Sequence, residues 1–335
     1  MADVLKSFSQ TCLQVMRDVN RISLTLFKIM IPILIVVKLL QEFGIIRWLS
    51  VPLEPVMSLV GLPASMGFVW ATAIFNSIFS GIVVYASLIG GDTPLSVAQI
   101  TVLGVMILVA HSLPVEIEIA RQSGPRFLFQ LMTRICSALI LGITLNLVYQ
   151  YGNWLQEPAV FTLKLAGNAP DLLDWARGQI QNLAIVYTTI LALVVLMRVL
   201  KWLKIIDMLT RCLHPVLRVL GIGEEATSIT IVALLLGISY GGGLIIQEAK
   251  SGNIGRRDIF FALTFMGLCH SLIEDTLLFF MIGAHLSGLL WARCLYALVF
   301  MFFLVRVVTK MSDRKFATYL FSSSFERQPK AAKSF

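Results

Sequence analysis

Two short stretches place a histidine, a serine and an acidic residue inside strongly apolar sequence. Residues 111–116 read HSLPVE, and residues 270–275 read HSLIED. Histidine gains and loses a proton near neutral pH, and a buried carboxylate beside it can tune that change. A single buried histidine is more often a structural residue, but two such stretches favour a polar functional site.

The spacing within each stretch predicts which groups meet. His270 and Glu274 are four residues apart, so on one helix the carboxylate would lie beside the imidazole and could orient it. His111 and Glu116 are five apart, and Glu118, seven residues after the histidine, would share its face better. We therefore expect His270 and Glu274 to form a proton-coupling pair.

The two stretches belong to a longer internal repeat. Residues 45–61 and 205–221 share seven identical positions at a constant offset of 160, among them Pro55 with Pro215. Unrelated apolar stretches of this length would share roughly one or two. The chain is therefore interpreted as a tandem duplication, which says more about architecture than any local motif.

The composition indicates a protein surrounded by lipid. Hydrophobic residues make up 57% of the 335 and charged residues 14%, whereas soluble domains have about 25% charged residues. Apolar runs long enough to cross about 30 Å of hydrocarbon recur along the chain. They cover residues 22–43, 64–89, 96–117, 127–149, 182–203, 226–248, 258–282 and 286–308. The predicted fold class is all-α, a polytopic helical membrane protein.

The charge distribution predicts the topology, because lysine and arginine favour the cytoplasmic side. Eight spans would violate this bias, whereas it is largely satisfied if helices 45–61 and 205–221 also cross. Each half then has about five crossings, and the halves face opposite ways, as in the inverted repeats of secondary transporters. Each short helix would span only about 26 Å, so re-entrant or interfacial helices are the alternative.

The expected organisation has five parts. They are an amphipathic cytoplasmic N-terminal segment (1–21), a first repeat (22–150), an extracytoplasmic linker (151–181), a second repeat (182–308) and a basic cytoplasmic tail (309–335). The net charge of +8 comes largely from basic residues at span ends, which favours lipid contact over nucleic acid. ATP-binding and hydrolase motifs are missing, so neither an enzyme nor a cofactor is expected, and no metal site is assigned.

Both halves interrupt a span with polar residues or glycines at corresponding positions. Three consecutive glycines weaken a helix by roughly 1 kcal/mol each, and paired interruptions point to a transporter binding site. The alternative is close helix packing through small residues. The candidate substrate-binding residues are Asn76, Ser77, Ser80, His111, Ser112, Glu116, Ser239, Tyr240, Gly241, Gly242, His270, Ser271, Glu274 and Asp275.

A basic stripe marks the second half alone. Arg211, His214 and Arg218 share one face of helix 205–221, whose counterpart carries Glu54. The stripe could gate the site or contact an anion, with Glu54 as a pairing partner across the repeat. Contact with lipid headgroups is the alternative.

The repeated pattern resembles the nucleoside-recognition (Gate) domain family. The residues that carry it are Pro55, Gly61, 76–81 and 111–116, then Pro215, Gly221, 237–243 and 270–275. This family includes spore maturation proteins A and B and membrane segments of ferrous iron transporter B, and the chain looks like a fusion of the two spore maturation proteins. The resemblance implies a bacterial inner-membrane protein with a transport-like core, but not a nucleoside substrate.

We therefore predict a secondary-type transporter or permease for a small polar solute, with anions among the candidates. Its site would lie between the broken helices, coupled to a proton or another cation, and both termini would be cytoplasmic. Membrane lipid and further copies of the chain are the other expected partners. The alternatives are a non-transporting, partner-binding envelope or morphogenesis protein and, third, an intramembrane enzyme that joins His111 and His270 through a water-filled cavity.

Overall fold

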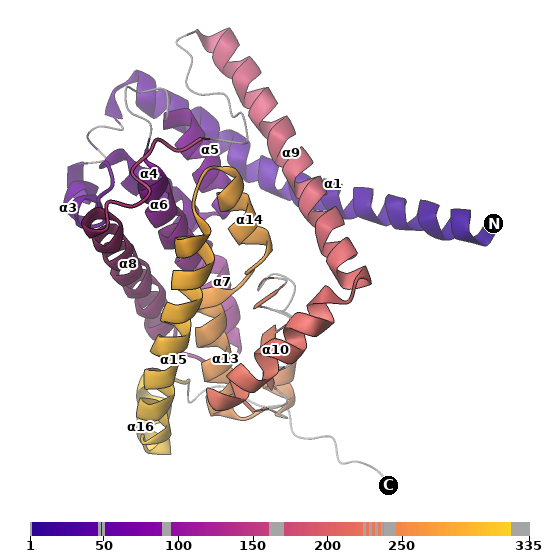
Figure 1. The fold of residues 1–335 in the computed structure, drawn as a ribbon, viewed down its shortest axis with the longest axis vertical. Coiled ribbons are helices and arrows are strands. Elements are labelled where there is room, and N and C mark those ends of the chain that lie inside the picture. The colour runs from indigo at the N-terminus through magenta and orange to yellow at the C-terminus, as the bar shows by residue number, and fades with distance from the viewer. Residues whose placement is uncertain are drawn as a thin grey trace.

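The computed structural model is built almost wholly of helices (Figure 1). It describes residues 2–45, 48, 51–88, 95–160, 171–223, 226–227, 230–231, 234–235, 237, 246–252 and 254–322. The helices are α1 (Ala2–Glu42), η1 (Val51–Leu53), α3 (Glu54–Leu59), α4 (Ser65–Phe75), α5 (Ile78–Leu88), α6 (Val97–Val109), α7 (Leu113–Gln122), α8 (Phe127–Tyr151), α9 (Leu172–Trp202), α10 (Ile205–Val219), α13 (Arg256–Cys269), α14 (Glu274–Met281), η2 (Ser287–Ala292), α15 (Arg293–Thr309) and α16 (Asp313–Tyr319). The all-α prediction is confirmed.

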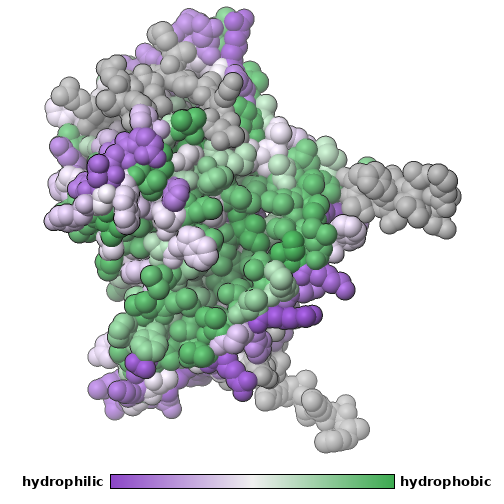
Figure 2. Space-filling view, in the orientation of Figure 1, coloured by the Kyte–Doolittle hydropathy of each residue, from purple (hydrophilic) through white to green (hydrophobic). Residues whose placement is uncertain are grey.

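Six helical segments of the described chain are long and apolar enough to cross a membrane. They are Leu13–Leu40, Val97–Gln122, Phe127–Tyr151, Leu172–Trp202, Arg256–Met281 and Ser287–Thr309. The span predicted over 64–89 is divided into the shorter apolar helices α4 and α5. An apolar surface extends across the middle of the face in Figure 2, and hydrophilic residues gather toward its upper and lower ends. The polytopic membrane prediction is confirmed at this level.

Helix α6 lies at the centre of the bundle. Eleven of its residues are buried, as expected for a helix that is apolar on all sides. It contacts α4, α8, α13 and η2. The Ser96 hydroxyl accepts from the Gln99 amide N–H and the Gln99 side chain accepts from the Ser96 N–H, so a capping box fixes its start. The helix therefore holds the residues that follow Val109 inside the core.

The helix predicted over 45–61 is not a single helix in its described part. A short 3₁₀ turn, η1, leads directly into α3, which has six residues and a length of about 9 Å. Pro52 and Pro55 fall in this segment, and each removes a helix donor. Residues 45 and 48 are also helical, and their neighbours 46, 47, 49 and 50 lie outside the described residues, so the crossing of residues 45–61 stays a prediction.

The counterpart helix α10 is continuous, but it too is short. Its 15 residues span about 22 Å, and its buried residues are Ile206 and Leu217. Five crossings in each half, and the inversion of the halves, stay predictions.

The long helices α1 and α9 form a second, smaller packing unit. Arg198 pairs with Asp18 at 2.7 Å, and the Tyr187 hydroxyl donates to Asn20 Oδ1 at 2.8 Å. In Figure 1 the N-terminal end of α1 projects away from the rest of the bundle. The boundaries predicted at residues 21 and 181 fall inside these two helices and not between elements. The five-part organisation as a whole stays a prediction.

Candidate functional site

Both histidine stretches interrupt a helix in the same way. Helix α6 ends just before the first stretch and α13 ends just before the second, and α7 and α14 resume the chain. Ser112 and Ser271 have φ values of 48° and 49°, in the left-handed region that residues other than glycine seldom adopt. The repeated sequence therefore produces the same left-handed turn at its serine in both copies, although α7 starts one residue after Ser112 and α14 three residues after Ser271.

The two histidine rings are fixed through the same nitrogen. His111 Nδ1 lies 2.9 Å from the Ile107 carbonyl oxygen, and His270 Nδ1 lies 2.9 Å from that of Met266. A carbonyl oxygen can only accept, so we assign the ring hydrogen to Nδ1 in both residues. The lone pair of each neutral ring is then on Nε2.

These two Nε2 atoms meet at one carboxylate. They lie 3.3 Å apart, and Glu116 Oε1 lies 3.4 Å from each of them. Both histidines are buried, and the Glu116 side chain is about one-tenth exposed. Residues that are 159 positions apart in sequence therefore form a single polar centre, called the histidine centre below.

Arg134 of α8 holds the carboxylate and the broken end of α6 together. Its guanidinium forms an ion pair with Glu116 Oε2 through Nη1. Nε donates to the Val109 carbonyl at 2.8 Å, and Nη2 donates to the His111 carbonyl at 3.2 Å. The carbonyls left by the helix break are thus satisfied by a buried charge.

The second copy contains a corresponding arginine with fewer partners. Arg293 is fully buried, and its Nη2 donates to Thr276 Oγ1 at 3.1 Å. Its Nε and Nη1 have no hydrogen-bond partner in the described part of the chain. Neither arginine was predicted from the sequence. Arg134 follows His111 by 23 residues, and Arg293 follows His270 by the same 23 residues. That repeated spacing is the signal that could have found them.

Two predicted pairings within the stretches are wrong. Because α13 ends at Cys269, His270 and Glu274 do not share a continuous helix, and the carboxylate beside His270 is that of Glu116. In the first stretch the turn at residue 112 brings Glu116 to His111 directly. Glu118 instead pairs with Arg121 at 2.7 Å on an exposed face.

The polar residues of the first interrupted span gather at the break between α4 and α5. The Asn76 amide donates to Ser80 Oγ, and the Ser77 and Ser80 hydroxyls lie 3.1 Å apart. The Ser112 hydroxyl donates to the Asn76 carbonyl at 2.9 Å, which links this break to the histidine stretch. The structure therefore brings these predicted residues together.

In the second copy Gly237 lies against the motif serine. It has a φ of 89°, and a Cβ there would lie 2.6 Å from Ser271 Oγ. The remaining predicted residues of this break, Ser239, Tyr240, Gly241 and Gly242, lie outside the described residues. Their role stays a prediction.

The basic stripe lies on α10. Arg211 and Arg218 are exposed and His214 is half-buried. Glu54 is exposed on α3, and no ion pair within the described residues joins it to the stripe. We find no polar contact between the stripe and the histidine centre in the same part of the chain. Its role in gating or anion contact stays a prediction.

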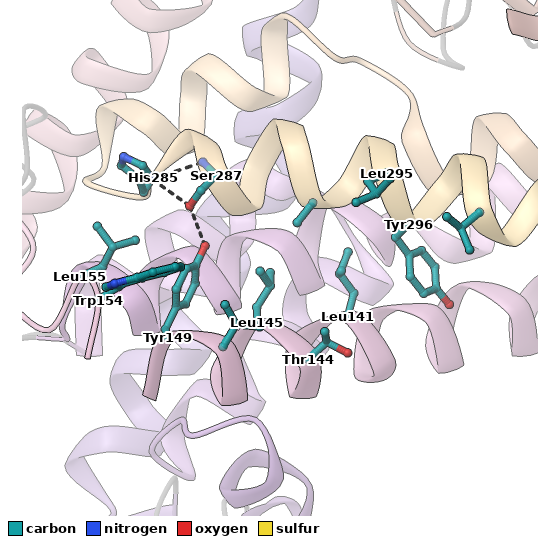
Figure 3. Close-up of a pocket in the computed structure, with 13 residues that line it drawn as sticks. Leu141, Thr144, Leu145, Tyr149, Trp154, Leu155, His285, Ser287, Leu295 and Tyr296 are labelled. Carbon is teal, nitrogen blue, oxygen red and sulfur yellow. Dashed lines mark hydrogen bonds between the residues drawn. The ribbon is translucent and has the colours of Figure 1, made fainter. Parts of the chain in front are cut away.

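A separate apolar groove of about 580 Å³ lies beside α8 and α15. Figure 3 shows Tyr149, Ser287 and His285 at one end, where a chain of 2.8 Å hydrogen bonds joins the three side chains. The other labelled side chains are almost all apolar. Neither motif histidine lines this groove. Such a surface on membrane-spanning helices fits acyl chains better than a polar solute.

The comparisons with known proteins agree with the Gate resemblance for the first of the two predicted repeats. Residues 23–124 match the Gate family model, described as nucleoside recognition. The chain is also 28% identical over 275 residues to the "Uncharacterized membrane protein YvoD" of Bacillus subtilis (strain 168), covering 80% of this chain and 86% of the relative. No solved structure matches the chain significantly. The chain is thus a multi-pass membrane protein, and the part of it that is similar to the Gate family contains the first histidine stretch.

Proposed function

We propose that this chain is a secondary-type membrane transporter for a small polar solute that binds at the histidine centre. The observation that carries the proposal is the meeting of His111, His270 and Glu116 where two apolar helices break. Ionisable groups within membrane spans are costly, and they mark solute pathways and proton relays.

The broken helices support the same function. Non-helical backbone at membrane depth is tolerated where it is buried in protein or lines a cavity, and discontinuous helices form the sites of many transporters. In Figure 1 the chain passes downward from α6 to α7 but upward from α13 to α14. This opposite order supports two halves of inverted orientation, moving against each other around a fixed site.

The charges of the centre favour a cation or a neutral solute over an anion. Glu116 Oε1 faces both histidines, and an Asp275 carboxylate oxygen lies within 4.8 Å of a nitrogen of each. An anion would meet two carboxylates and, at neutral pH, two ring lone pairs. The exposed stripe on α10 is therefore not needed for solute binding in this proposal.

Transport by purified protein in liposomes tests this proposal. A pH-sensitive dye inside the vesicles would report proton flux on addition of divalent cations, nucleosides or dicarboxylates in turn. We expect one class to drive flux in the wild type, and His270→Ala to abolish it. His285→Ala, which removes a histidine outside the centre, should retain wild-type rates.

Two outcomes would contradict the proposal. If His270→Ala transported as fast as the wild type, the centre would have no part in solute movement. If folded wild-type protein moved none of the solutes, the partner-binding alternative would be favoured instead.

A further inference from the structure

The histidine centre brings acceptor atoms together without a donor between them. Each Nδ1 is committed to a backbone carbonyl, so both Nε2 atoms present lone pairs. Glu116 Oε1 adds a negative acceptor 3.4 Å from each. With both rings neutral, three buried acceptors at this separation repel one another, so positive charge, either an added proton or a metal ion, stabilises the centre.

The separations fit a metal ion better than hydrogen bonds. N–H donors usually lie about 2.9–3.0 Å from their acceptors, whereas these three atoms are 3.3, 3.4 and 3.4 Å apart. Ligands bound tetrahedrally to Zn²⁺ at 2.0–2.1 Å are about 3.3 Å from one another. The triangle of Nε2, Nε2 and Oε1 therefore has the size of one face of a zinc coordination tetrahedron.

Asp275 is the candidate for a fourth ligand. An Asp275 carboxylate oxygen and a ring nitrogen of each histidine all lie within 4.8 Å of one another. Asp275 is the second residue of α14. Glu116 is not part of this group of three, so the start of α14 has to move before Asp275 and Glu116 can bind the same ion. The remaining vertex of the tetrahedron is thus open to a residue of the second copy.

The surroundings of these ligands are those of a metal site. Metal-bound histidines usually donate their other ring N–H to a carbonyl or carboxylate, as both do here. The ligating carboxylate is usually hydrogen-bonded as well, and Arg134 binds Glu116 through the oxygen that faces away from the rings. The two histidines and Glu116 are therefore oriented before any ion arrives.

We propose that His111, His270, Glu116 and Asp275 bind a divalent transition-metal ion of the zinc type. Imidazole with carboxylate suits zinc and similar ions, whereas magnesium and calcium prefer oxygen ligands alone. The inference rests on the proposed function in one respect, since it makes this ion the solute. The nearby Arg134 and Arg293 weaken binding, which suits an ion that must also leave.

Metal binding to purified, chelator-treated protein in detergent tests the inference. Co²⁺ serves as the probe because its visible absorption distinguishes tetrahedral from octahedral coordination, and Zn²⁺ should displace it. We expect the tetrahedral spectrum in the wild type. Loss of a residue that only supports a ligand already weakens metal binding roughly 10- to 100-fold, so His111→Ala and Asp275→Asn should weaken it at least that much. His285→Ala should bind as the wild type does, and Mg²⁺ should not compete.

The wild-type spectrum keeps the test decisive even if a histidine variant fails to fold. An octahedral spectrum, no binding, or binding that both His111→Ala and His270→Ala retain would each overturn the inference. A centre that holds only a proton would give no cobalt spectrum at any pH. Transport separates this test from that of the proposed function. Cobalt binding without solute uptake would support the metal site and contradict the proposed transport function. Uptake of another solute without cobalt binding would support transport and contradict the metal site.

Discussion

The two copies of the histidine stretch share a backbone but differ in how their charges are paired. Ser112 and Ser271 have nearly the same φ, and each histidine is fixed to the carbonyl four residues earlier. In the first copy Arg134 uses Nε, Nη1 and Nη2 as donors. In the second, Arg293 uses Nη2 alone within the described residues. All three guanidinium nitrogens of Arg134 therefore donate hydrogen bonds, whereas two of those of Arg293 have no partner among the described residues.

A difference of one methylene group accounts for much of this asymmetry. Glu116 is long enough to reach both histidines and Arg134. Its counterpart at the same distance from the second histidine is Asp275, whose carboxylate is closer to its own backbone. The first copy thus supplies a carboxylate that an arginine holds in place.

Replacement of the two arginines should break this comparison most clearly. Arg134→Met leaves Glu116 buried without its cation, and removal of one partner of a buried pair costs about 3–5 kcal/mol. Arg293→Met removes a side chain two of whose donors have no hydrogen-bond partner among the described residues, so it should lower the unfolding free energy much less, or raise it. Denaturant unfolding in detergent micelles would measure both. Equal losses of unfolding free energy in the two variants would mean that Arg293 has interactions beyond its hydrogen bond to Thr276.

Substitution of Gly237, which lies against Ser271, should have an intermediate effect on the unfolding free energy. Gly237→Ala places a Cβ 2.6 Å from Ser271 Oγ at a φ of 89°, so we expect a loss of about 1–3 kcal/mol in unfolding free energy. Gly267→Ala, inside α13, meets only an ordinary 3.4 Å contact with Arg134 Cδ. That control should be neutral or gain up to about 1 kcal/mol. A neutral Gly237→Ala would show that the second copy is loosely packed as well as loosely paired.

The sequence predicted the residues of the centre better than their contacts. The repeat and the apolar surroundings of His111 and His270 were enough to select them, because buried ionisable groups need a reason. The carboxylate partners of the two histidines were predicted wrongly because a continuous helix was assumed through each histidine stretch. Positive φ at serine has no reliable sequence signature, and it is this turn that moves Glu116, rather than Glu118 or Glu274, to the rings.

The repeat predicts less about the local helix type in residues 45–61 and 205–221. Residues 51–53 form a 3₁₀ turn that leads into α3, whereas the aligned residues 211–213 are α-helical within α10. Pro52 has no counterpart at the aligned position, which is Cys212. Proline removes a helix donor, so this substitution accompanies the local change of helix type while the repeat remains visible.

The smallest expected effect distinguishes the two acids of α7. Glu118 and Arg121 form an exposed pair, and solvent-exposed ion pairs contribute little to stability. Glu118→Gln should therefore leave both the unfolding free energy and cobalt binding nearly unchanged. Glu116→Gln, two residues earlier on the same helix, removes a ligand and the partner of Arg134, so binding should weaken strongly. If Glu118→Gln weakened cobalt binding as much, helix α6 would continue through residue 112, and the contact expected from helical spacing would replace the observed one.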